Sequence, residues 1–150
     1  LKGVFFANAQ RLQRPHFVIS SIEHPAVTEP LRFLETLGAR VTRVPVDGYG
    51  LVDPDDVRRA IEPETVLVSV MLANNEVGTI QPIEEIAAIA REHEILLHTD
   101  AAQAVGKIAV DVESMGVDML SIAGHKLYAP QGIGALYVRE GIELTPFMHG

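Results

Sequence analysis

The sequence contains no cysteine among its 150 residues. Disulfide bonds, thiolate metal sites and a thiol nucleophile are therefore excluded within these residues. The sequence also lacks any apolar run close to the roughly 20 residues that span a bilayer, and no stretch resembles a signal peptide. These absences lead us to expect a protein with no membrane segment and a cytoplasmic location.

Positive charge is scarce. Lys and Arg together number 12 against 20 for Asp and Glu, which gives a formal net charge of −8. Because nucleic-acid binding depends on clustered Lys and Arg, this balance argues against a general nucleic-acid partner, although a small anionic ligand responds only to local donors. The glycine-rich dinucleotide fingerprint, the Walker loop and the Gly-x-Ser-x-Gly elbow are also absent.

Strand-like and helix-like segments alternate along the chain. The segment 65–72 is apolar at most positions, which is typical of a central strand in a parallel sheet, and Pro82 precedes apolar residues at the 3.6-residue period of a helix. We predict an α/β domain with a mostly parallel sheet and helices on both faces. Strands are expected at 16–20, 40–46, 65–72, 95–99, 118–122 and 134–138, and helices at 1–12, 25–37, 54–61 and from 82 onward.

Two of the expected strands end in charged residues. Asp100 follows the strand 95–99, and Lys126 follows the strand 118–122 and Gly124. Open α/β sheets bind ligands at the carboxyl ends of their strands, where a lysine can form a Schiff base with a carbonyl cofactor and a carboxylate can pair with a pyridinium nitrogen. A solvated surface lysine and a helix-capping aspartate are the alternative interpretations.

Further polar residues follow other strand ends. Gln103 lies three residues beyond Asp100, and Asn75 follows the strand 65–72, so both amides could donate to a ligand oxygen. His24 follows the first strand and could stack on an aromatic cofactor or transfer protons. Hydrogen bonding within loops is the alternative for the two amides, and a role at the entry of a helix is the alternative for His24. His93, His98 and Asp100 could also be considered as metal ligands, but no supporting pattern accompanies them, and we expect no metal.

Three segments in order identify a family. MLANNEVGTIQPI, HTDAAQAVGK and VDMLSIAGHKLYAPQGIGALYV resemble segments of the cysteine desulfurases and selenocysteine lyases. These enzymes belong to aminotransferase class V, a group of fold-type I enzymes that depend on pyridoxal 5'-phosphate (PLP). The resemblance covers nearly the whole chain from SSIEHPAV onward, and three ordered motifs are far more specific than any one of them.

The resemblance implies a role for each matching residue. Lys126 is similar to the Schiff-base lysine of the family, and Asp100 to the partner of the pyridine nitrogen. Gln103 and Asn75 are similar to the groups that bond the phenolate oxygen. His24 is similar to the histidine stacked on the ring, with a catalytic role, and His125 to a phosphate ligand.

The chain departs from the family pattern at a few positions. Ala123 stands where a hydroxyl for the phosphate is common, and Ala129 and Gln131 stand where a glycine and a basic residue are usual. The resemblance further implies that residues 1–150 are part of the PLP-binding large domain. The family's phosphate loop, nucleophilic cysteine, carboxylate-binding arginine and small domain would then belong to other parts of a longer protein.

The activity implied is removal of sulfur from L-cysteine, or selenium from L-selenocysteine, to give alanine. A homodimer, a sulfur-acceptor protein and a place in iron–sulfur cluster assembly are implied with it, and the isolated segment is expected to be inactive. Another class V enzyme, such as an aminotransferase or a kynureninase-like hydrolase, is an alternative. A non-catalytic ligand-binding α/β fragment is a second.

The parallel sheet leads to a geometric prediction. Because the carboxyl ends of parallel strands share one edge, the side chains of Asp100, Gln103, Asn75, His24 and Lys126 should converge on one pocket. Asp100 and Lys126 should not form a direct salt bridge, since a pyridine ring has to fit between them.

Overall fold

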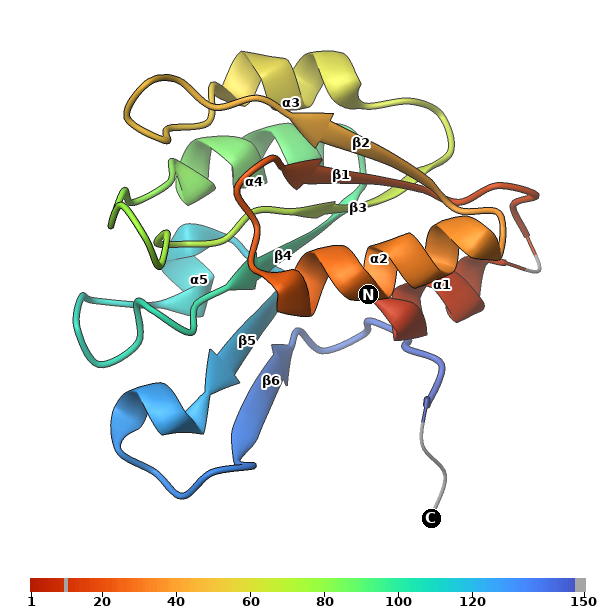
Figure 1. Ribbon diagram of the computed structural model, residues 1–150. Helices are drawn as coiled ribbons and strands as arrows, with labels where there is room; N and C mark the ends of the chain where they lie inside the picture. The colour runs from red at the N-terminus through yellow and green to blue at the C-terminus, as the bar shows by residue number, and fades with distance from the viewer. Residues whose placement is uncertain (10, 148–150) are drawn as a thin grey trace.

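A computed structural model describes residues 1–9 and 11–147 of the chain. Its centre is a six-stranded sheet in the order β2-β1-β3-β4-β5-β6, shown in Figure 1. Five strands are parallel, and β6 pairs antiparallel with β5. The strands are β1 (His16–Ser20), β2 (Arg40–Val44), β3 (Thr65–Ser69), β4 (Leu96–Asp100), β5 (Met119–Ala123) and β6 (Gly134–Val138).

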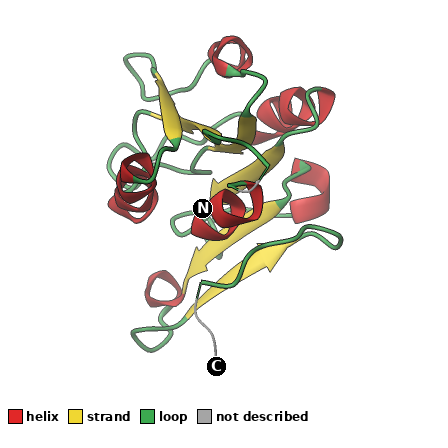
Figure 2. Cartoon of the chain, turned by 90° about the vertical axis from the view of Figure 1, so that its right-hand side faces the viewer, coloured by secondary structure: helices red, strands yellow, loops and turns green. Residues whose placement is uncertain are grey.

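Helices cover both faces of the sheet, as predicted (Figures 1 and 2). One face packs against α1 (Lys2–Asn8) and α2 (Pro25–Thr36), with Phe5, Leu31 and Phe17 in its core. The other face packs against α3 (Pro54–Ala60), α4 (Ile83–Glu92) and α5 (Val112–Met115), around residues such as Ile86 and Val68. Buried apolar side chains of the strands and helices form both cores.

Several expected elements end earlier in the structure than the sequence pattern predicts, among them the first helix and the third strand. The first helix ends at Asn8, whose side-chain amide donates to the carbonyl of Val4. Strand β3 ends at Ser69, although the apolar run continues to Leu72. The backbone beyond Ser69 still follows β4, because Val70 N–H and Leu72 N–H donate to the carbonyls of His98 and Asp100. The apolar runs therefore predicted correctly which residues are buried, but they did not predict where the strand or helix ends.

The turn after β5 depends on a glycine. A Cβ at Gly124 would lie 2.7 Å from the carbonyl oxygen of Ile133, while the Gly124 N–H donates to that same oxygen at 2.8 Å. A residue with a side chain could not approach this closely. The short 3-10 helix η1 (Gly124–Leu127) begins there, and it presents His125 and Lys126 at the carboxyl end of β5.

No helix in the described part of the chain is long and apolar enough to cross a membrane.

Candidate active site

A cavity of about 290 Å³ lies at the carboxyl edge of the parallel strands. Small-ligand sites begin at about 300 Å³, so its size suits a small molecule or part of one. The five residues predicted to converge all line it, together with His125. Its remaining lining residues are Ala26, Met71, Ala73, Ala102, Ser121, Ile122 and Ala123.

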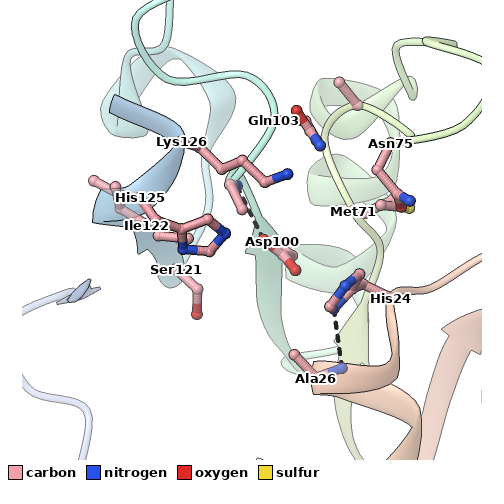
Figure 3. A pocket seen from close by; sticks show the side chains of 13 residues that line it. His24, Ala26, Met71, Asn75, Asp100, Gln103, Ser121, Ile122, His125 and Lys126 are labelled. Atoms are coloured by element: carbon pink, nitrogen blue, oxygen red, sulfur yellow. Dashed lines mark hydrogen bonds between the residues drawn. The ribbon is translucent and has the colours of Figure 1, made fainter. Parts of the chain in front are cut away.

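Lys126 and His125 reach the cavity from η1. In Figure 3 they lie on one side of the pocket, while His24, Met71 and Asn75 lie on the other. Among the described residues, no ion pair or hydrogen bond engages the Lys126 ammonium. The residue is exposed, so its amine is available to a ligand.

Asp100 occupies the last position of β4, between these two sides (Figure 3). Its Oδ1 accepts a hydrogen bond from Ala102 N–H at 2.9 Å, so Asp100 caps a turn rather than a helix. Within the described range, no partner engages its Oδ2 and no salt bridge joins it to Lys126. A largely buried carboxylate with one free oxygen is suited to receive a cationic ligand group, because burial of an unpaired charge is costly.

Gln103 is held by a neighbouring lysine. Lys107 Nζ donates to Gln103 Oε1 at 2.8 Å and to the Gln103 carbonyl at 3.0 Å. Because an ammonium can only donate, the amide oxygen must face Lys107 and the amide nitrogen is left for the pocket. Asn75 lines the pocket, whereas its neighbour Asn74 is buried and accepts from Glu76 N–H and Val77 N–H.

His24 lies at the entry of a helix and also faces the cavity. Its Nδ1 accepts from Ala26 N–H at 3.1 Å, so the ring caps the N-terminus of α2. The same ring lines the cavity. A helix-entry role and a ligand-facing position are therefore compatible.

Glu23 is a buried carboxyl beside the pocket that the sequence did not single out. Its Oε1 accepts from Ser20 Oγ at 2.5 Å and from Met71 N–H at 2.8 Å, whereas Oε2 is buried without a partner in the described structure. Burial raises the pKa of Glu23 to about 7, and the charge of Asp100 contributes in the same direction. Only its position directly before His24 in the sequence could have drawn attention to it.

His98 lies deeper under the same edge. Its Nδ1 is hydrogen-bonded to Ser69 Oγ and its Nε2 to Ser121 Oγ, each at 2.8 Å, so both ring nitrogens are engaged. Burial is the main cause that lowers the pKa of His98 to about 3. Within residues 1–9 and 11–147, no group of three His, Cys, Asp or Glu side chains could hold a metal.

These contacts define an α/β domain with one small pocket at the carboxyl ends of its strands. The pocket is lined by the amine of Lys126 and by the carboxylate of Asp100, of which one oxygen accepts a hydrogen bond from the protein. Amide and imidazole donors complete the lining. This donor set suits a cofactor with a carbonyl carbon, a basic ring nitrogen and anionic oxygens.

Comparison with known proteins names the family. The aminotransferase class V model matches residues 6–150, and the chain belongs to that family. Over its whole length it is 51% identical to Cysteine desulfurase IscS of Dictyoglomus turgidum and 50% identical to Cysteine desulfurase IscS of Methanosarcina thermophila. It covers 38% and 37% of those two proteins, so it spans less than two fifths of their length.

Solved structures agree with this assignment. The structure of SspA in complex with cysteine matches with a TM-score of 0.94 and 46% identity, over 99% of this chain and 43% of that chain. A NifS-like protein matches with a TM-score of 0.93 and 39% identity, over 99% of this chain and 41% of that chain. Class V enzymes and cysteine desulfurases depend on PLP, and the donor set of the pocket fits that cofactor.

Proposed function

We propose that the protein containing this chain is a PLP-dependent cysteine desulfurase, and that residues 1–150 form the part that binds the cofactor. The observation that carries the proposal is the convergence of Lys126 and Asp100 on one pocket without a salt bridge between them. The names of the relatives support the choice among class V activities.

The side chains have distinct proposed tasks. Lys126 supplies the ε-amine that attaches the cofactor and, when free, takes and returns a proton at the substrate carbons. The free Oδ2 of Asp100 holds the proton on the pyridine nitrogen. The amide nitrogens of Gln103 and Asn75 donate to the phenolate oxygen, His125 donates to the phosphate, and the His24 ring stacks on the pyridine and assists proton transfer. When bound, PLP supplies an electron sink for the negative charge that develops on the substrate.

L-Cysteine is the proposed substrate, with L-selenocysteine as a second, and alanine is the proposed product. The carbon–sulfur bond breaks, the sulfur passes to a thiol as a persulfide, and a proton takes its place on carbon. Because this chain has no cysteine, the accepting thiol must come from another part of the protein or from an acceptor protein. SspA with bound cysteine supports the choice of substrate. We propose a homodimer for the full-length protein.

Attachment of the cofactor tests the proposal. Full-length protein is loaded with PLP, reduced with borohydride and digested, and mass spectrometry then locates the modified residue. We expect the modification on Lys126, its loss in Lys126→Ala, and its retention in Lys107→Ala, where the neighbouring lysine is removed instead. Attachment at another lysine in the wild-type protein would overturn the assignment.

Product analysis tests the activity. With L-cysteine as substrate, the loaded wild-type protein should release equal amounts of alanine and transferred sulfur. Amino-group transfer to a keto acid, with no sulfur released, would instead show another class V activity.

A further inference from the structure

A buried hydrogen-bond chain runs across three neighbouring strands beneath the pocket. Ser69 lies on β3, His98 on β4 and Ser121 on β5, and both links of the chain measure 2.8 Å. One end is fully buried, since Ser69 has no solvent exposure. The other end is open, because Ser121 lines the cavity; Figure 3 shows it below His125.

The direction of the chain follows from its hydrogens. A serine hydroxyl has one hydrogen, and a neutral imidazole has one donor and one acceptor nitrogen. In the described structure, Ser69 Oγ has no hydrogen-bond partner besides His98. If His98 Nδ1 carried the ring hydrogen, the Ser69 hydrogen would be buried without an acceptor, and such orphaned donors are rare in proteins.

The opposite arrangement satisfies every hydrogen. Ser69 O–H donates to His98 Nδ1, and His98 Nε2–H donates to Ser121 Oγ. The Ser121 oxygen then accepts from His98, and its own hydrogen is free to donate elsewhere. The ring stays neutral at physiological pH, because burial holds the pKa of His98 near 3.

The strand register places Ser121 next to Asp100 on the neighbouring strand. Ser121 is the register partner of Asp100 across the β4–β5 pair. His98 and Asp100 are two residues apart on one strand and share a face, so Ser121 lies on the same face as both. Asp100 and Ser121 both line the same cavity.

We propose that Ser121 is a further binding residue of the cofactor pocket, fixed as a hydrogen-bond donor by the Nε2–H tautomer of His98. Its hydroxyl donates to the part of the cofactor that the Asp100 carboxylate engages. His98 and Ser69 are positioning residues that act through Ser121. This inference rests on the proposed function for the identity of the ligand, whereas the direction of the chain does not.

The structure contains a matched control. His16 on β1 also lies between two hydroxyls, with Nδ1 2.8 Å from Thr65 Oγ1 and Nε2 2.9 Å from Thr42 Oγ1. Thr65 Oγ1 already accepts from Glu62 N–H, so its hydrogen is available to His16 Nδ1. The same tautomer is therefore expected for His16, at the opposite edge of the sheet from the pocket.

Nitrogen NMR of cofactor-free full-length protein, labelled with ¹⁵N in its histidine rings, tests the direction of the chain. We expect His98 to show a protonated Nε2 and an unprotonated Nδ1, and His98→Gln provides the assignment. A protonated Nδ1 on His98 would overturn the proposal, because the Ser121 hydrogen would then be used by the ring. This result does not depend on PLP binding.

Equilibrium binding of PLP to the same protein tests the role of Ser121. Loss of a hydrogen bond on the charged side of the pocket should make Ser121→Ala bind about tenfold more weakly, equivalent to about 1.4 kcal/mol. Ser121→Thr keeps the hydroxyl and should recover most of the affinity, and Thr42→Ala should bind like wild type.

Two outcomes of the binding experiment would contradict the proposal. One is wild-type affinity in Ser121→Ala, and the other is an equal loss in Thr42→Ala, which would indicate general destabilisation. Failure of the wild-type protein to bind PLP at all would instead refute the proposed function, and the NMR result would still decide the direction of the chain.

Discussion

The amino ends and the carboxyl ends of the parallel strands form two edges of the sheet. Each edge carries a buried histidine between two hydroxyls, and the histidine at the carboxyl edge lies under the pocket described above. At the amino edge, His16 joins Thr65 on β3 to Thr42 on β2. At the carboxyl edge, His98 joins Ser69 on β3 to Ser121 on β5. Both bridges satisfy buried polar groups and tie three strands together.

The surroundings of the two histidines differ. Near His16, Arg40 forms ion pairs with Glu62 at 2.5 Å and Glu64 at 3.2 Å. Burial lowers the pKa of His16, and the two glutamates oppose the shift. Near His98, the charged groups Asp100 and Lys126 are not paired with each other and face the cavity. The same local arrangement therefore stabilises one edge and, by our proposal, serves ligand binding at the other.

The largest expected effect comes from neutralising the carboxylate at the carboxyl edge. Asp100→Asn keeps an oxygen for Ala102 N–H, so the fold should persist, but a neutral amide cannot hold a pyridinium proton. We expect turnover by the full-length enzyme to fall roughly 10²–10³-fold, as for loss of other electrostatic groups in active sites. Steady-state kinetics measure this change. Glu64→Gln at the amino edge is the control. A comparable loss of turnover in that variant would contradict the proposal that only the carboxyl edge serves catalysis.

The buried carboxyl of Glu23 should make stability depend on pH. Its pKa rises from 4.5 to about 7 on folding, so the folded state holds this proton more tightly than the unfolded chain does. The resulting stability is fully present below pH 4.5 and is lost as pH rises through about 7. By linkage, the loss amounts to about 3 kcal/mol.

Denaturant unfolding of cofactor-free Glu23→Gln and wild-type full-length protein tests this prediction. The amide keeps an acceptor for Ser20 and Met71 and removes the buried charge. The free energy of unfolding of the variant should therefore increase relative to that of the wild type as pH rises from 5 to 8. Identical pH profiles for the two proteins would show that Glu23 does not titrate in this range.

At the amino edge, Thr65→Val should affect stability alone. The substitution leaves Glu62 N–H and His16 Nδ1 without their shared partner, which should cost about 1–3 kcal/mol. Thermal unfolding measures the loss, and PLP affinity should stay at the wild-type value. A weaker affinity for PLP would show that the amino edge is coupled to the pocket.

The smallest expected effect separates the two roles of His24. His24→Asn retains an acceptor for Ala26 N–H at the start of α2 and removes the ring, so stability should change little. Loss of aromatic stacking, worth about 1 kcal/mol, should weaken PLP binding about fivefold. His24→Ala should lose both the cap and the ring. If His24→Asn bound PLP with the wild-type affinity, the stacking role would be refuted and only the capping role of His24 would remain.

Much of the fold could be predicted from the sequence. The run 65–72 identified a central strand, and the strand expected at 118–122 placed His125 and Lys126 just beyond a strand end. The pocket prediction was also correct, because strand ends with polar residues meet at one edge whenever the strands are parallel. The placement of Asp100, Gln103, Asn75, His24 and Lys126 around one cavity confirms it, while their chemical roles stay predictions.

Other features depended on contacts between distant residues. Residue alternation in a strand assigns a side chain to a face, but it does not reveal which strand lies beside it or in which register. Ser69, His98 and Ser121 therefore gave no sign of forming a chain, and Glu23 gave no sign of binding Met71, 48 residues away. The sequence by itself determined the elements, their order and the polar strand ends. Only the tertiary structure decided the neighbours across strands, because hydrogen bonds between strands depend on register rather than on local pattern.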